Sequence, residues 1–128
     1  MKLLDTTFLI DMVAGVKETE RILNSKEMLL TTQINMYEFM RGLFLRNVSS
    51  EKVLEMMGLF ETIKVLSLDE DAALKSAEIS AQLMKNGEMI PDNDCFIAGI
   101  TLSKKVPTIV TRNIKHFKRI KGLIIESY

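Results

Sequence analysis

Four acidic residues stand out because carboxylates rarely occupy such surroundings. Asp5 ends an apolar opening run, Glu38 lies in a largely apolar stretch, and Asp92 and Asp94 follow Pro91. An unpaired charge costs several kcal/mol to bury, so an acid at the end of a buried strand requires a cation or a group of donors. Acids that gather from separate elements repel one another unless a divalent cation is present. Asp5, Glu38 and Asp94 therefore predict a metal site.

The ligand types indicate which metal such a site would take. Oxygen ligands without a set of His or Cys suit Mg²⁺ or Mn²⁺ and not zinc. One or two such ions leave positions open for water and for the phosphate oxygens of a phosphodiester. A simpler interpretation of Asp92 or Asp94 remains, because an acid in the first turn of a helix caps its free N–H groups.

The elements that position these acids follow from the hydrophobic pattern. Short apolar runs alternate with stretches of helical spacing, which predicts an α/β fold around a parallel sheet of about five strands. Thr32, Ser49 or Ser50, and Asp69 are N-cap signals, and Gly87 can end the longest helix. Strands are expected at 3–4, 28–30, 63–66, 108–110 and 123–125, helices at 8–14, 17–25, 34–46, 50–61, 69–85 and 93–104, and a short turn at 114–117.

Three of the acids should meet at one edge of this sheet. Ligands of open parallel sheets bind at the carboxyl ends of the strands and the amino ends of the following helices. Asp5 ends the first expected strand, Glu38 lies about a turn into the helix after the second, and Asp94 lies in the first turn of the last long helix.

Composition restricts the class of protein. The 128 residues with 47% hydrophobic content predict a single domain over 1–128, and the lone Cys95 excludes an internal disulfide. No apolar run approaches the roughly 18 residues that a membrane span needs. Asp5 and Asp11 come too early for a secretory segment. We expect a cytoplasmic protein with no membrane association.

The formal net charge is zero, but the charges are unevenly distributed. Residues 101–128 hold seven Lys and Arg and only one acid, Glu126, whereas acids outnumber bases in the rest of the chain. This basic segment either contacts phosphates beside the acidic site or forms a solvated helix face.

Four motifs in order resemble the PIN domain, and more narrowly the VapC-type ribonuclease toxins of prokaryotic toxin–antitoxin pairs. The resemblance covers almost the whole chain. The motifs are Leu4-Asp5-Thr6-Thr7, Tyr37-Glu38 with Gly42, Ile90-Pro91-Asp92-Asn93-Asp94-Cys95-Phe96-Ile97-Ala98-Gly99, and Val110-Thr111-Arg112-Asn113 with His116-Phe117.

The resemblance implies a three-layer α/β/α fold and metal-dependent endoribonuclease activity. By position, Asp5, Glu38 and Asp94 match the metal-binding acids of the family, and Asp92 matches an additional catalytic acid. Thr6 or Thr7 and Asn113 match polar positions that could orient a metal-bound water or steady a carboxylate. For the threonines, a hydroxyl that satisfies local backbone N–H groups is the alternative.

His116 departs from the family pattern, because many members have an acid before this phenylalanine. The substitution makes the second metal doubtful, and His116 is either a metal ligand, a donor to phosphate or a surface residue. The candidates for contact with the RNA backbone are Arg112, Lys115, His116, Lys118 and Arg119.

The resemblance also implies protein partners, an antitoxin and a second copy of the chain. The helices after the second strand contain more apolar side chains than one helix face can bury, among them Met36, Met40, Met56, Met57 and Phe44. We expect most of these in the core and a groove there for an amphipathic antitoxin segment. The alternative function is a catalytically silent PIN-like module that binds RNA or protein.

Overall fold

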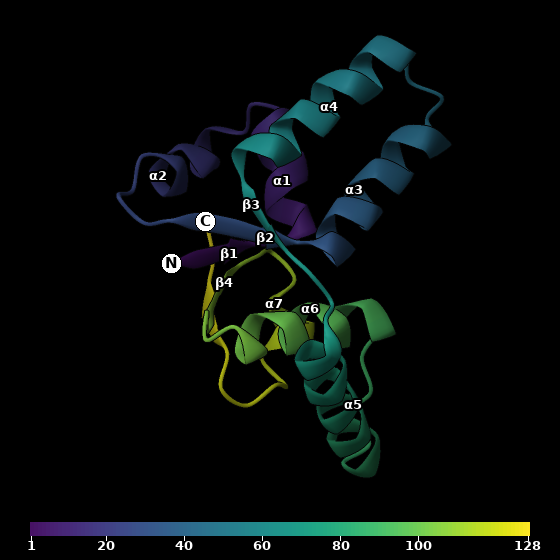
Figure 1. The fold of residues 1–128 in the computed structure, drawn as a ribbon. Coiled ribbons are helices and arrows are strands. Elements are labelled where there is room, and N and C mark those ends of the chain that lie inside the picture. The colour runs from purple at the N-terminus through teal and green to yellow at the C-terminus, as the bar shows by residue number, and fades with distance from the viewer.

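A five-stranded parallel sheet forms the centre of the computed structural model, which describes all 128 residues (Figure 1). The strand order is β3-β2-β1-β4-β5, and helices cover both faces. The predicted α/β/α architecture with a parallel sheet of about five strands is confirmed. The strands are β1 (Lys2–Leu4), β2 (Leu29–Thr32), β3 (Lys64–Leu66), β4 (Thr108–Val110) and β5 (Ile124–Glu126).

The strands are short apolar runs because the sheet is buried on both faces. Successive residues of a strand point to opposite faces, so both must be apolar when helices cover both. Leu3 pairs with Ile109 and Leu4 pairs with Val110 in the register of β1 and β4. The first pair belongs to one core cluster and the second pair to the other, and all four are fully buried.

The helices divide between the two faces. In Figure 1, α1, α3 and α4 lie above the sheet, and α5, α6 and α7 lie below it. None of them has both the length and the apolar character that a membrane crossing requires. Their bounds are α1 (Thr6–Val13), α2 (Glu20–Leu23), α3 (Gln33–Leu45), α4 (Ser50–Thr62), α5 (Glu70–Lys85), α6 (Asp92–Ser103) and α7 (Ile114–Phe117).

The predicted cap residues begin and end the helices as expected. Thr32, Ser49 and Asp69 each accept a side-chain hydrogen bond from the backbone N–H three residues later. Gly87 has a φ of 68°, and the bond from Glu88 N to the Leu83 carbonyl closes the end of α5.

Two of the expected helices differ from the prediction by more than one residue at an end. The stretch expected as one helix over 17–25 starts with the 3₁₀ turn η1 (Lys17–Thr19) and continues as the short α2. The Thr19 hydroxyl donates to the Val16 carbonyl at 2.6 Å and supports the tight first turn. The first helix starts at Thr6 instead of residue 8, directly after Asp5.

α5 and α6 approach each other closely at Gly99, which has no side chain to separate them. A Cβ atom at this position would lie 1.9 Å from Ser76 Oγ and 2.9 Å from the Ala72 carbonyl oxygen. Asp94 lies in the first turn of α6. The close contact at Gly99 therefore fixes the position of a helix that carries one of the predicted acids.

Gly99→Ala should lower the free energy of unfolding by about 1–3 kcal/mol, because the methyl group forces α5 and α6 apart. Gly58→Ala is the matched control: its Cβ would meet nothing within 4 Å in the interior of α4, so a gain of about 0.5–1 kcal/mol is expected. Urea unfolding of both variants measures the two effects, and equal stability of the two would contradict the close contact.

Candidate functional site

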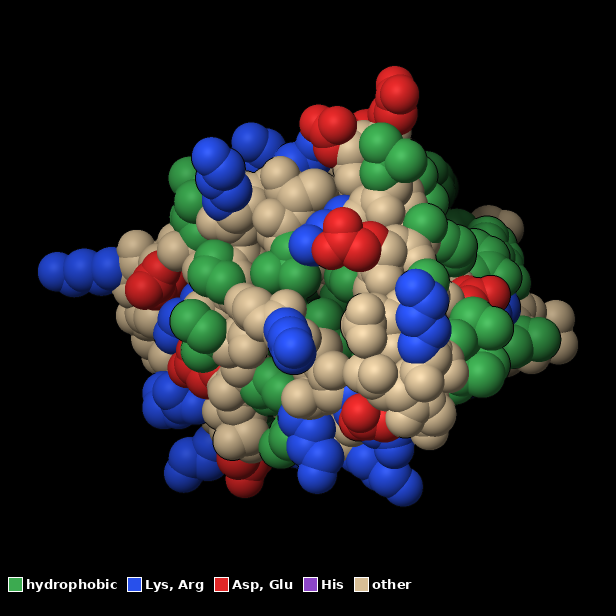
Figure 2. Space-filling model, turned by 90° about the horizontal axis from the view of Figure 1, so that it is seen from below, with side chains coloured by type: hydrophobic (Ala, Val, Ile, Leu, Met, Phe, Trp, Pro, Cys, Tyr) green, Lys and Arg blue, Asp and Glu red, His purple; other side chains and the backbone are tan.

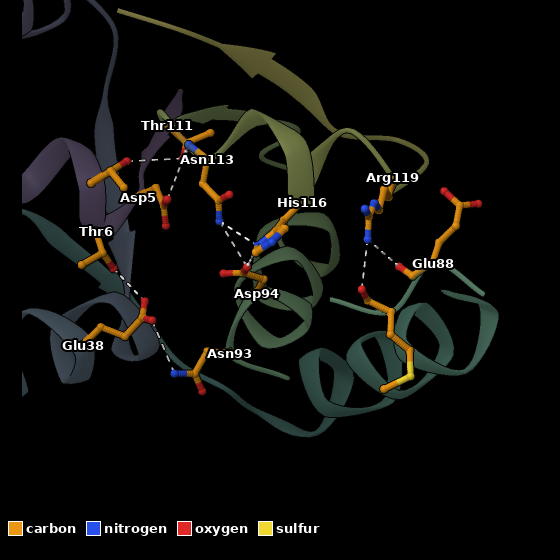
Figure 3. A network of polar contacts seen from close by, with 12 residues as sticks. Asp5, Thr6, Glu38, Glu88, Asn93, Asp94, Thr111, Asn113, His116 and Arg119 are labelled. Carbon is orange, nitrogen blue, oxygen red and sulfur yellow. Dashed lines mark hydrogen bonds and ion pairs between the residues drawn. The ribbon is translucent and has the colours of Figure 1, made fainter. Parts of the chain in front are cut away.

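The predicted acids gather at the carboxyl edge of the sheet, where the strand order reverses direction. β1 lies between β2 and β4, so the connections from the sheet diverge at this point. Asp5 directly follows β1, Glu38 lies in the second turn of α3, and Asp94 lies in the first turn of α6. Figure 3 shows the three side chains around a common region, linked by polar neighbours.

Asp5 is buried and bonded to uncharged donors. Its exposed fraction is 4%, and although it occupies the N-cap position of α1, its side chain makes no capping bond. One carboxylate oxygen accepts from Asn35 Nδ2 at 3.0 Å, and the other accepts from Thr111 Oγ1 at 2.6 Å. Both oxygens are therefore satisfied, but no basic side chain forms an ion pair with Asp5.

The pKa of Asp5 is raised from 3.8 to about 6. Burial is the main cause, since it penalises the charged form, and the negative charges of Asp94 and Glu38 add to the increase. The hydrogen bond from Thr111 opposes it. The negative charges of Glu38 and Asp94 therefore act on Asp5, as expected of a cluster that favours a bound cation.

Glu38 is half-buried and held by two further polar side chains. Thr6 Oγ1 donates to one carboxylate oxygen at 2.8 Å, and Asn93 Nδ2 lies 3.4 Å from the other. Thr7 Oγ1 accepts from the backbone N–H of Arg112 at 3.1 Å. Arg112 is distant from Thr7 in the sequence. Neither threonine hydroxyl therefore accepts from a backbone N–H of its own segment, which was the alternative interpretation of these residues.

The residue that joins Asp5 to Glu38 is Asn35, which the sequence analysis missed. It is fully buried, and it forms a capping box with Thr32 at the start of α3. Its Oδ1 accepts from Thr32 Oγ1 at 2.7 Å, while its Nδ2 donates to Asp5 and, at 3.0 Å, to Thr6 Oγ1. The available signal was an amide three residues after a threonine cap.

Asp94 is held by two polar residues of the predicted basic segment, Asn113 and His116. His116 Nδ1 lies 2.7 Å and Asn113 Nδ2 lies 3.3 Å from the same oxygen, Oδ2 of Asp94. Because a carboxylate only accepts, Nδ1 of His116 is the donor in its bond to Asp94, and Asn113 Nδ2 lies 3.0 Å from the same Nδ1. Asp94 does not cap α6, since that helix has no side-chain capping bond.

Asp92 does not join this cluster. It is exposed, and it lines a different cavity with Ser80, Met84 and Cys95, between α5 and α6. Its side chain has no hydrogen bond to Asp5, Glu38 or Asp94. The structure thus brings together three of the four acids that the sequence singled out.

The cluster fits a hard cation in its chemistry but is not closed around one. Its donors are carboxylate, amide and hydroxyl oxygens, the ligands that Mg²⁺ and Mn²⁺ prefer. No three His, Cys, Asp or Glu side chains stand close enough to hold an ion between them. Hydrogen bonds from Asn35, Thr6 and Asn93 occupy oxygens of Asp5 and Glu38.

The candidates for RNA contact differ in what surrounds them. Lys115 and Lys118 are exposed and form no ion pair, whereas Arg112 pairs with Asp11 at 2.9 Å and Arg119 donates to the carbonyls of Glu88 and Met89. In the view from below, basic side chains are scattered over the face with acidic ones between them (Figure 2).

An apolar groove of about 540 Å³ lies between α1 and α3. Glu38 lines it, together with Arg46 and Lys52. On the neighbouring surface of α3, Phe44 is 62% and Leu45 75% exposed, as expected of a surface that binds a partner. The groove is lined by the apolar residues Ile10, Val13, Ala14, Phe39, Leu43 and Leu45.

Comparisons with known proteins indicate the family. A model described as the PIN domain matches residues 2–123. The chain is 33% identical over 86 residues to "Ribonuclease VapC1" of Methanocaldococcus jannaschii. This match covers 66% of this chain and 62% of that protein. The chain is also 34% identical over 71 residues to "tRNA(fMet)-specific endonuclease VapC" of Salmonella typhimurium. This match covers 56% of this chain and 53% of that protein. The matches thus span about half to two thirds of these relatives.

The fold similarity extends further than these sequence matches. The structure of VapBC-1 from nontypeable Haemophilus influenzae superposes with a TM-score of 0.84 and 26% identity, and covers 98% of this chain and 96% of that chain.

Asp5→Asn should stabilise the fold at neutral pH by about 1–3 kcal/mol. Because the pKa of Asp5 rises from 3.8 to about 6 on folding, its ionisation lowers stability as the pH increases through this window. The gain in stability of Asp5→Asn over the wild type should be absent below pH 3.8 and complete above about pH 6. Urea unfolding of the wild type and the variant across this range measures it, and parallel stability curves would contradict the assignment.

Proposed function

Because the chain belongs to the PIN-domain family, we propose that it is a metal-dependent endoribonuclease, the toxin of a toxin–antitoxin pair. The observation that carries the proposal is the convergence of Asp5, Glu38 and Asp94 from three separate elements at one edge of the sheet. The names of the relatives support the reaction class.

The proposed metal ligands are Asp5, Glu38 and Asp94, with Mg²⁺ or Mn²⁺ as the cation. When bound, such an ion lowers the pKa of a water molecule and stabilises charge on the phosphate. An ion would also relieve the repulsion that contributes to the raised pKa of Asp5.

The chain's own residues orient the acids and the substrate. Thr6 and Asn93 hold Glu38, while Asn113 and His116 hold Asp94. We propose that water attacks phosphorus in line and that the bond to the 3′ oxygen breaks, which leaves a 5′ phosphate and a 3′ hydroxyl. Lys115 and Lys118 are exposed and unpaired, so they are the best placed cations for the RNA backbone.

The proposed site of the antitoxin is the groove between α1 and α3. Its apolar lining suits one face of an amphipathic segment, and Glu38 on its wall would accept a basic side chain of that segment. Of the apolar residues predicted in this region, Met40 and Met56 are buried and Met36 packs partly buried against the core, whereas Met57 and Phe44 are exposed. Homodimer formation stays a prediction.

The test is cleavage of a mixed structured and single-stranded RNA pool by the wild type, Asp5→Asn and Asp94→Asn, in Mg²⁺, Mn²⁺ or chelator. We expect cleavage only with metal and a loss of more than about 100-fold in both variants. Glu61→Gln, which removes an exposed carboxylate at the end of α4, should cleave like the wild type.

The ends of the products decide the mechanism. A 5′ phosphate and a 3′ hydroxyl are expected, whereas cyclic phosphates would contradict water attack at a metal site. No cleavage in any metal, together with no metal binding, would favour the catalytically silent module.

His116→Ala should lower cleavage by about tenfold and leave metal affinity nearly unchanged. The ring hydrogen-bonds to Asp94, so we expect it to orient that ligand and not to replace one. Single-turnover cleavage and calorimetric metal titration measure the two quantities. A loss of metal binding would instead make His116 a ligand.

A further inference from the structure

Arg112 follows Thr111 at the edge of the site, but its guanidinium group is bound by residues outside the acid cluster. Its Nε lies 2.9 Å from Asp11 Oδ2, on α1. Its Cζ atom lies 5.0 Å from the ring centroid of Tyr128, within the range of a cation–π interaction. The cation therefore already has two partners.

Tyr128 completes this arrangement. Its hydroxyl donates to the same Asp11 oxygen at 2.6 Å. Its ring packs edge-on against the buried Phe8, with ring centroids 4.9 Å apart and planes at 79°. Asp11, Arg112 and Tyr128, here called the Arg112 clamp, thus join α1 to the segment after β5.

The backbone at Arg112 is fixed by a second set of bonds. The Arg112 N–H donates to Thr7 Oγ1 at 3.1 Å, and the Thr111 N–H donates to the Glu126 carbonyl at 3.1 Å. The Asn113 N–H donates to Thr111 Oγ1 at 2.9 Å. The turn at residues 111–113 is therefore held by the side chain of Arg112 and by the backbone N–H groups of all three residues.

The two residues on either side of Arg112 each bind a different acid. Thr111 donates to Asp5 at 2.6 Å, and Asn113 donates to Asp94 at 3.3 Å. A shift of the turn would move both donors together, and displacements of about 1 Å can cost roughly 100-fold in rate.

We propose that Arg112 is a positioning residue, held by Asp11 and Tyr128 so that Thr111 and Asn113 keep Asp5 and Asp94 in their relative places. The inference rests on the proposed nuclease function and deepens it. It also changes the expectation from sequence, in which Arg112 was a contact to the RNA backbone. A guanidinium that moved to a phosphate would lose its ion pair with Asp11 and its contact with the ring of Tyr128.

A positioning role of Arg112 and a contact of Arg112 with the RNA backbone predict different kinetics. Arg112→Lys, Asp11→Asn and Tyr128→Phe each weaken the Arg112 clamp and preserve size. We expect kcat to fall by about tenfold in each, with KM and its salt dependence unchanged. The double variant of Asp11→Asn and Arg112→Lys should lose no more than either single variant.

Lys118→Ala is the matched control for a phosphate contact, because Lys118 is exposed and unpaired. It should raise KM and lower the slope of the salt dependence by about one. If Arg112→Gln, which removes the charge that Arg112→Lys keeps, shows this rise in KM and this lower slope, Arg112 is an RNA contact. A lower melting temperature in the three clamp variants with kcat unchanged would also overturn the proposal.

Hydrogen exchange separates failure of the clamp from failure of the proposed function. If the wild type cleaves no RNA, the nuclease assignment fails, but the clamp still predicts at least about tenfold faster exchange of the Arg112 and Asn113 amides in Asp11→Asn. Unchanged exchange at both amides would overturn the clamp itself.

Discussion

The carboxylate of Asp5 must be satisfied at a place from which water is nearly excluded, and much of the structure around it meets this requirement. Its two donors come from the segments that follow the strands on either side of β1: Asn35 lies in α3, after β2, and Thr111 lies directly after β4. The central place of β1 in the sheet is what allows this. Both donors are neutral, so the negative charge remains, and its burial raises the pKa of Asp5.

The parts of the fold that could be predicted are those that depend on local pattern. A strand covered on both faces needs consecutive apolar residues, so Leu3-Leu4 and Ile109-Val110 identify β1 and β4 without any knowledge of their neighbours. The caps at Thr32 and Asp69 also act within a single turn of helix. Asp5, Glu38 and Asp94 could be selected because carboxylates at such ends need a partner.

The parts that could not be predicted depend on contacts between distant segments. The sequence indicates that Thr32 begins a helix, but not that the amide of Asn35 reaches back to Asp5. Asp92 and Asp94 differ by two residues, which is about 200° around a helix axis, and only the packing of α6 selects Asp94 for the cluster. Arg112 counts as a free cation in the sequence, whereas Asp11 binds it in the fold.

Glu38 belongs to two surfaces, since it is bonded to Thr6 within the acid cluster and also lines the groove between α1 and α3. A side chain shared in this way couples the two surfaces energetically. A ligand that draws Glu38 into the cluster changes the wall of the groove, and a segment that draws it toward the groove takes an oxygen donor from the cluster. By linkage, each proposed ligand would then weaken the other by the same factor, so an ion and a partner segment that compete for Glu38 would antagonise each other without any change of fold.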